Sequence, residues 1–227
     1  MTQARKAVAL ISGGLDSMLA AKLIKDQGVH VEGINFFTGF CVEGHTHAIR
    51  ADKHDRPKRN NALWSAEQVG IKLHIVDVIE EYKDVVMNPK HGYGAHLNPC
   101  LDCKGFMVKK AREWMEAHGF DFIITGEVVG QRPMSQRKDT MPVVARESGA
   151  FDRLLRPQCE KILPPTLPER EGWVDRDKAV SELRRAVGAT YDVPDAEAMR
   201  ALGAELARRL GRGDLVVLTG ELGSGKT

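Results

Sequence analysis

Residues 7–17 read AVALISGGLDS, and this stretch decides the fold. Its first five residues are apolar and few enough to form one buried strand. Apolar residues recur at helical spacing from Met18 to Ile24, and between the two segments lie two glycines, two serines and an aspartate. The pattern therefore predicts a strand, a glycine loop over residues 12–17, and a helix.

The same alternation of strand and helix continues along the chain. Compact apolar runs predict further strands, and stretches of helical period predict helices between them. Strands that alternate with helices form a parallel sheet covered on both faces. We therefore expect an α/β fold with a Rossmann-like, doubly wound parallel sheet, with strands at 29–37, 71–76 and 120–125 and helices at 62–69 and 102–118.

Composition narrows the class of protein. The chain has 227 residues, of which 42% are hydrophobic and 28% charged, as in soluble globular proteins. It contains no run approaching the ~20 apolar residues that a bilayer span needs. The apolar run that follows the first basic residues is too short for a signal peptide, so we expect a cytoplasmic protein without membrane contact. A net charge of +2 does not by itself indicate nucleic-acid binding.

The glycine loop has the composition of an anion site. Backbone N–H groups and the positive end of a helix dipole converge there. Gly13 and Gly14 let the backbone approach a phosphate closely, Ser12 and Ser17 add hydroxyl donors, and Asp16 could hold the magnesium ion of a polyphosphate. The alternative is a tight turn capped by Ser17, which does not call for this combination of residues.

The sequence SGGLDS at residues 12–17 resembles the pyrophosphatase loop of the PP-loop ATP-binding enzymes, which cleave ATP between its α and β phosphates. The resemblance implies a site for ATP and Mg²⁺, in which the departing pyrophosphate is held while AMP passes to a substrate oxygen. Members include amidating ligases and the tRNA 2-thiouridine and 4-thiouridine synthetases. The residues that would hold pyrophosphate are Ser12, Gly13, Gly14, Asp16 and Ser17.

Two thiols stand at the start of a predicted helix, where residues 98–104 read NPCLDCK. The helix N-terminus and Lys104 favour the thiolate form of Cys100 or Cys103. Such a thiolate could carry a persulfide, attack an adenylated carbonyl carbon, or join in holding an iron–sulfur cluster. The alternatives are two ordinary buried cysteines or half of a zinc site. Cys41 and Cys159 are isolated; one could supply a third ligand, although each alone is typical of a small core residue.

The cysteine segment resembles the Asn-Pro-containing cysteine segment of tRNA thiolation enzymes, and residues 122–127, FIITGE, are similar to a later strand of theirs. The resemblance covers about residues 6–175 and implies that Thr125, Gly126 and Glu127 lie beside ATP. It implies ATP-dependent thiolation of a tRNA uridine. Adenylation of the C2 or C4 oxygen would release pyrophosphate, and sulfur from a donor protein or sulfide would follow. Asp16, Cys100 and Cys103 would be the catalytic residues.

Two other functions fit the same residues. A PP-loop ligase that uses ammonia or a small acid would leave the thiols dispensable. A non-catalytic cysteine metal module could merely retain the nucleotide pocket. Without a separate RNA-binding domain in view, tRNA would contact the catalytic domain or a partner protein. Candidate contacts are the basic residues Arg50, Lys53, Arg56, Lys58, Arg59, Arg132, Arg137 and Lys138, for which a solvated loop is an equal alternative. We interpret His45, His47 and His54 as solvated loop residues rather than a metal site.

The C-terminal part differs in character. Residues 163–173, LPPTLPEREGW, carry three prolines without a period and predict a strap or linker. We expect a domain over 1–175, a linker over 176–194 and an incomplete α/β appendage over 195–227. The appendage ends in GELGSGKT, a Walker A sequence after a predicted strand at 215–218. It resembles the beginning of the ATPase required for threonylcarbamoyl modification of tRNA adenosine. We expect no ATPase activity from it, because the helix and distant aspartate of a working P-loop are not present.

Overall fold

The computed structural model describes residues 4–39, 60–93, 99–131, 134–159 and 161–178. The chain divides into two compact units, Met1–Arg176 and Asp177–Thr227. Nearly all of the second unit lies outside the described residues. The linker and the truncated P-loop appendage therefore stay predictions, and the fold described below is that of the first unit.

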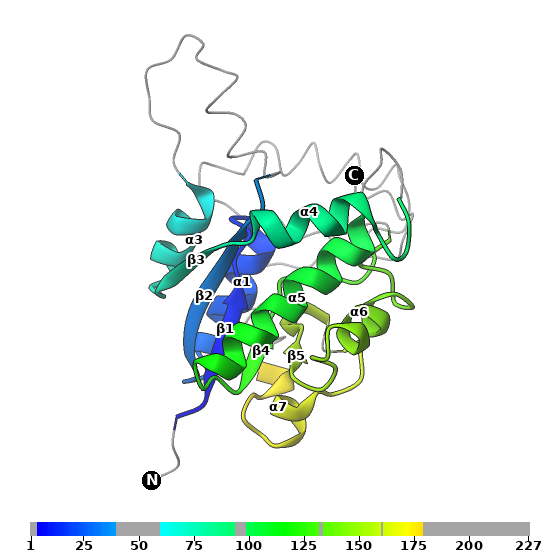
Figure 1. Ribbon diagram of the computed structural model, residues 1–227. Helices are drawn as coiled ribbons and strands as arrows, with labels where there is room; N and C mark the ends of the chain where they lie inside the picture. Colours follow the sequence, from blue (N-terminus) through cyan, green and yellow to red (C-terminus); the bar gives the residue numbers. More distant parts are fainter. Residues whose placement is uncertain (1–3, 40–59, 94–98, 132–133, 160, 179–227) are drawn as a thin grey trace, which may run out of the picture. The chain divides into compact units, whose positions relative to one another are not determined.

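Among the described residues, five parallel strands form one sheet in the order β3-β2-β1-β4-β5 (Figure 1). In the register, Ala7 of β1 is opposite Val31 of β2 on one side and Phe122 of β4 on the other. The direction of winding reverses at β1, since the chain moves outward to β2 and β3 and returns to β4. The predicted doubly wound α/β class is confirmed. The strands are β1 (Lys6–Leu10), β2 (His30–Phe37), β3 (Leu73–Asp77), β4 (Phe122–Ile124) and β5 (Leu154–Leu155).

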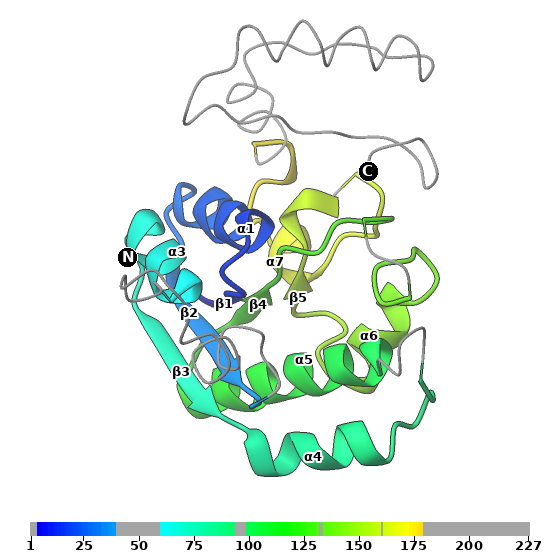
Figure 2. The ribbon, with the colours of Figure 1, turned by 90° about the horizontal axis from the view of Figure 1, so that it is seen from above.

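Helices cover both faces of the sheet (Figure 2). α1 (Leu15–Lys25) and α3 (Asn61–Val69) lie on one face, and α5 (Cys100–Ala117) and α6 (Met141–Glu147) lie on the other. α4 (Ile79–Met87) packs against α5.

The core has two apolar layers, because successive side chains of a strand point to opposite faces. Ala7 and Ala9 of β1 face α1, where Ala20 and Ala21 are also fully buried or nearly so. These small side chains let α1 lie close to the sheet. Val8 points the other way, into a layer built with larger residues of α5 and α6: Val108, Met115 and Val144. The alternation explains why β1 reads as a continuous apolar run.

The ends of α3 follow helix-capping chemistry. The side chain of Asn60 accepts a hydrogen bond from Leu63 N at 3.1 Å, and Gly70 closes the helix in the left-handed conformation at φ 68°. α3 therefore has fixed ends, which matters because its first residues support the glycine loop.

The segment 163–173 differs from its prediction as an irregular strap. It contains the short helix α7 (Leu167–Arg170), which begins with a capping box between Thr166 and Glu169. Trp173 then packs on the core cluster beside α1 and lies under the guanidinium of Arg5, 4.1 Å from the ring centre. The prolines thus start a helical turn instead of excluding one, and the segment closes the unit against its own N-terminus. No helix in the described part of the chain is long and apolar enough to cross a membrane.

Candidate functional site

The site lies where β1 and β4 end side by side. Their C-terminal ends lead into the glycine loop, residues 12–17, and into a second loop, residues 125–131, which we call the β4 loop. In an open parallel sheet, the crevice at the point where winding reverses is the usual place for a ligand. Both segments named from the sequence as nucleotide-binding therefore start at this one point.

Contacts on two sides shape the glycine loop. Gly13 has φ +85°, and a Cβ there would lie 2.8 Å from Asn61 Cβ at the start of α3. Gly14 is the N-cap of α1, whose first turn carries Asp16. The hydroxyl of Ser17 is buried and donates to Gly14 O at 2.8 Å, while it accepts from Ser12 Oγ at 3.3 Å. Ser17 thus holds the loop in shape, and Ser12 is the exposed hydroxyl.

A residue that the sequence analysis did not name contacts the catalytic candidate Asp16. Gln131, at the end of the β4 loop, donates from Nε2 to Asp16 Oδ2 at 2.8 Å. The two loops are therefore joined by a side-chain hydrogen bond. No local pattern could have identified this contact, since it depends on the sheet order that brings β4 next to β1.

Gly126 brings the two loops into direct backbone contact. A Cβ on Gly126 would lie 2.4 Å from the carbonyl carbon of Asp16 and from the backbone nitrogen of Ser17. Real Cβ atoms do not approach other atoms so closely, so this position requires glycine in the observed structure. Gly126 thus presses the β4 loop against the first turn of α1.

Glu127 is the centre of a buried polar network behind the crevice. Its side chain is 1% exposed; Oε2 accepts from Arg156 Nε and from Thr125 Oγ1, each at 2.9 Å, and Oε1 is 3.7 Å from Lys104 Nζ. Burial raises the pKa of Glu127, but the charges of Lys104 and Arg156 outweigh burial and hold that pKa below its ordinary value. Within the described part of the chain, Oε1 accepts no hydrogen bond. A charged carboxylate is therefore fixed between two cations.

The two thiols of the cysteine segment lie at the N-terminus of α5, as the sequence predicts. Cys100 is the first residue of the helix, and Cys103 donates its backbone N–H to Pro99 O at 2.8 Å. Both side chains are partly exposed. Tyr82 of α4, which the sequence analysis did not name, donates its hydroxyl to Cys103 Sγ at 3.0 Å. The sulfur of Cys103 therefore accepts a hydrogen bond from the neighbouring helix.

Cys159 has a different setting from the pair on α5. It is 1% exposed, its Sγ–H donates to Glu127 O at 3.0 Å, and its sulfur accepts from Val129 N at 3.3 Å. This thiol fastens the β4 loop to the 3-10 turn η2 (Pro157–Cys159). Among the described residues, no group of three or more His, Cys, Asp or Glu side chains could hold a metal ion. Cys41, the other candidate third ligand for an iron–sulfur cluster, lies outside the described residues.

Only two of the predicted RNA-contact residues, Arg137 and Lys138, lie in the described part of the chain. Arg137 pairs with the neighbouring Asp139 at 2.9 Å, and both side chains are exposed. Lys138 is also exposed. The remaining basic candidates, and the three histidines interpreted as solvated, lie outside the described residues: Arg50, Lys53, Arg56, Lys58, Arg59, Arg132, His45, His47 and His54.

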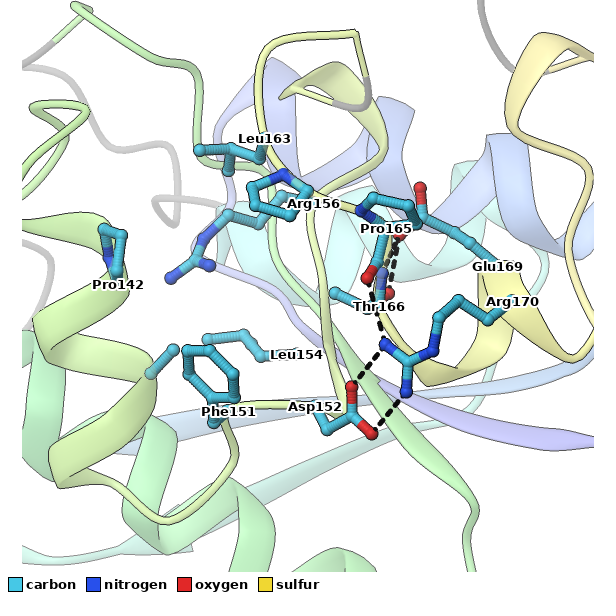
Figure 3. A pocket seen from close by; sticks show the side chains of 12 residues that line it. Pro142, Phe151, Asp152, Leu154, Arg156, Leu163, Pro165, Thr166, Glu169 and Arg170 are labelled. Atoms are coloured by element: carbon cyan, nitrogen blue, oxygen red, sulfur yellow. Dashed lines mark hydrogen bonds and ion pairs between the residues drawn. The ribbon is translucent and has the colours of Figure 1, made fainter.

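A cavity of about 140 Å³ opens between α6, β5 and α7 (Figure 3). Its walls are mainly apolar, and its polar margin carries the ion pair between Asp152 and Arg170, at 2.7 Å. The hydrogen bond from Arg170 holds the pKa of Asp152 below its ordinary value. Arg156 is shared by the cavity and the Glu127 network. None of the site residues named from the sequence lines this cavity.

Comparison with known proteins gives the family. The family model described as tRNA methyl transferase HUP domain matches residues 5–146. The chain belongs to this family. The matched range of the HUP domain includes the glycine loop, both thiols of α5 and the β4 loop.

Curated relatives carry a common name. The chain is 31% identical over 188 residues to the tRNA-specific 2-thiouridylase MnmA of Marinobacter nauticus, an alignment that covers 74% of this chain and 47% of the relative. It is 32% identical over 138 residues to the protein of the same name from Geotalea uraniireducens, covering 54% of this chain and 34% of that one. The predicted relationship to PP-loop tRNA thiolation enzymes is confirmed. The chain spans about half or less of the length of these relatives.

Among solved structures, a 4-thiouridine synthetase–RNA complex with bound ATP is similar at a TM-score of 0.49 and 21% identity, covering 78% of this chain and 42% of that one. This similarity is too low to add to the family assignment.

Proposed function

We propose that the chain carries the ATP-using and sulfur-transferring centre of a tRNA uridine thiolation enzyme. The observation that carries the proposal is a continuous set of contacts between three segments. Gly126 lies against Asp16 of the glycine loop, and its neighbour Glu127 pairs with Lys104, next to Cys103. The loop proposed to bind the nucleotide and a thiol would therefore share one edge of the sheet. The names of the HUP-domain relatives support uridine in tRNA as the substrate.

The first step would be adenylation of the uridine. The C2 carbonyl oxygen attacks the α phosphorus of ATP, an O–P bond forms, the bond from the α phosphorus to the bridging oxygen breaks, and pyrophosphate leaves. N–H groups at the start of α1 and the exposed hydroxyl of Ser12 would receive the pyrophosphate. Gly13 and Gly126 let the two loops pack directly on the first residues of α3 and α1. Thr125 would contribute indirectly, because its hydroxyl donates a hydrogen bond to the Glu127 carboxylate and so orients it.

Magnesium fits the residues at this point. Mg²⁺ prefers oxygen ligands and is commonly bound by one or two carboxylates together with phosphates. Asp16 offers a partly exposed carboxylate on the first turn of α1, and this carboxylate accepts a hydrogen bond from the exposed Gln131 at 2.8 Å. Asp16 would therefore hold the ion, which would neutralise charge on the departing pyrophosphate.

The second step would transfer sulfur. A persulfide on Cys103, received as sulfane sulfur from the persulfide of a donor protein whose own thiol is released, attacks C2 with its terminal sulfur, and AMP leaves with the former carbonyl oxygen. The thiolate of Cys100 then attacks the inner sulfur. This breaks the S–S bond, releases thiouridine and leaves a disulfide between the two cysteines, which a thiol reductant must reduce before the next turnover. The described residues do not supply a set of ligands for an iron–sulfur cluster, so no step uses one.

The experiment is a product analysis with purified protein, ATP labelled at the α phosphate, and tRNA from cells that lack thiolated uridine. We expect AMP and pyrophosphate in equal amounts, dependent on tRNA, and thiouridine only when a sulfur source is added. Release of ADP and orthophosphate would contradict the proposal, and so would AMP formation that proceeds equally well without tRNA. Bulk tRNA already carrying the thiouridine is the matched control.

A further inference from the structure

Lys104 lies between the Cys103 thiol on α5 and the β4 loop, which contacts the glycine loop. It follows Cys103 on the first turns of α5, and its ammonium is 3.7 Å from Oε1 of Glu127 at the end of β4. The Lys104 side chain is 26% exposed, and the Glu127 carboxylate with which it pairs is 1% exposed. The lysine therefore reaches from the partly exposed surface to a buried carboxylate. The contact joins a helix on one face of the sheet to a loop at its edge.

The buried carboxylate of Glu127 requires a compensating positive charge. A buried carboxylate is costly unless cations and hydrogen bonds surround it. Arg156 and Thr125 both use Oε2, and Oε1 accepts no hydrogen bond from the described residues. Among the described residues, the ion pair that reaches Oε1 is that of Lys104. This ion pair therefore connects the first turns of α5 to the end of β4.

The other end of the link is rigid. Gly126 leaves no space between its backbone and that of Asp16 and Ser17, so the β4 loop is packed directly on the start of α1. Glu127 is also held by two hydrogen bonds: the thiol of Cys159 donates to its backbone oxygen, and Arg156 Nε donates to its carboxylate. Tyr82 also contacts Cys103, but it belongs to α4, which packs on the outer side of α5. The Lys104–Glu127 contact is therefore a polar link from the thiol turn to the β4 loop, beside the apolar packing of Leu101 and Phe106 on the core.

We infer that Lys104 and Glu127 are positioning residues that hold the Cys103 turn of α5 in register with the glycine loop. This inference rests on the proposed function for its effect on sulfur transfer, but the positioning itself is a property of the fold. Loss of the link would leave the nucleotide site intact and let the thiol turn drift. Adenylated tRNA would then form and be hydrolysed, because water reaches C2 before the sulfur does.

The structural test is amide hydrogen exchange in four full-length variants. Lys104→Met removes the cation, Lys104→Arg keeps one, and Lys109→Met removes an exposed lysine from the same helix. We expect amides 103–107 to exchange about tenfold faster in Lys104→Met than in Lys109→Met, a change of about 1.4 kcal/mol in the opening equilibrium. Lys104→Arg should restore protection to within about twofold. Glu127→Gln should match Lys104→Met if it folds; unchanged protection in Lys104→Met overturns the inference even if Glu127→Gln does not fold.

A second readout separates this inference from the proposed function. In Lys104→Met we expect the KM for ATP and the rate of pyrophosphate release to stay within about twofold of wild type, while thiouridine formed per pyrophosphate falls about tenfold. A merely destabilising change would lower both rates together. If the thiol turn loosens but wild-type protein releases no pyrophosphate with tRNA, the positioning stands and the proposed function fails. If sulfur transfer and pyrophosphate release fall in parallel, the positioning role is wrong.

Discussion

The backbone of Gly126 rests on the peptide unit that joins Asp16 to Ser17, with no room between them for a methyl group. The contact is made by main chain on main chain, so it does not depend on side-chain rotamers. Strand β4 thereby sets the position of the first turn of α1, and with it the position of the Asp16 carboxylate. A methyl group at residue 126 tests this relationship directly.

Gly126→Ala should force the two loops apart. Its Cβ would lie 2.4 Å from backbone atoms that cannot rotate away, so we expect a loss of about 1–3 kcal/mol in the free energy of unfolding, and weaker ATP binding. Gly105→Ala is the matched control, because a Cβ on Gly105 meets nothing within 4 Å inside α5. That variant should gain up to about 1 kcal/mol from helix propensity. Urea unfolding measures both, and equal midpoints for the two variants would contradict the tight contact.

Asp16→Asn should remove the charge proposed to hold magnesium while it keeps the shape of the side chain. We expect pyrophosphate release to fall by about 100-fold or more, with little change in stability, because the carboxylate is partly exposed. Asp26→Asn, at the other end of α1, removes a carboxylate that pairs with Lys22 on the surface and should keep full activity. Initial rates at several magnesium concentrations provide the measurement. Wild-type rates in Asp16→Asn would remove Asp16 from the mechanism.

The three described cysteines should behave in two ways. Cys100→Ser and Cys103→Ser should abolish thiouridine formation and leave pyrophosphate release in place, since both lie on α5 and outside the glycine loop. Cys159→Ala should lower stability by about 1–2 kcal/mol, because it leaves Glu127 O and Val129 N without the sulfur that both contact. Nucleoside mass spectrometry of the tRNA, combined with chemical denaturation, separates these effects. A Cys159→Ala protein that is stable yet unable to transfer sulfur would show that Cys159 takes part in the chemistry.

Glu127 should make the protein sensitive to acid. Its pKa lies below the ordinary value in the folded state, so between the two values the unfolded chain binds more protons. The stabilisation is therefore complete above about pH 4.5 and is lost as the pH falls through the lowered, folded-state pKa. In Glu127→Gln we expect a loss of about 3–5 kcal/mol at pH 7, since Arg156 is left buried without its carboxylate.

The pH series also provides a check on this assignment. The difference in unfolding free energy between wild type and Glu127→Gln should shrink as urea titrations are repeated at lower pH. A difference that stays constant from neutral pH down to acid would show that the charge of Glu127 does not stabilise the fold.

Strong local patterns allowed most of the fold to be predicted. β1, the glycine loop and α1 form one uninterrupted signal, and α5 carries apolar residues on one face over 18 residues. α4 was not assigned from the sequence, although its apolar residues recur at helical spacing; the helix is short, and only Tyr82 of its residues is buried. β5 has two residues, too few for any period, although both are fully buried.

The site residues also differ in how well the sequence predicts them. The glycine loop and the paired thiols are recognisable because each is a contiguous motif, whereas Arg156 and Gln131 act through partners far away in sequence. The sequence predicts Ser17 as a ligand donor, and this stays a prediction; in the structure its buried hydroxyl donates to Gly14 O. A motif shows which residues are present but not which side chains face inward.

The contact of Arg5 with Trp173 brings the two ends of the first unit together at one place on its surface. A short peptide could therefore join residue 176 to residue 4, and the chain could be opened instead at the exposed turn around Gly92. Such a circular permutant would place the thiol helix ahead of the glycine loop in the sequence, with α4 as its last helix, yet the same strands would pair. The site therefore requires that β1 pairs with β4, but it does not require a particular order of the two strands along the sequence.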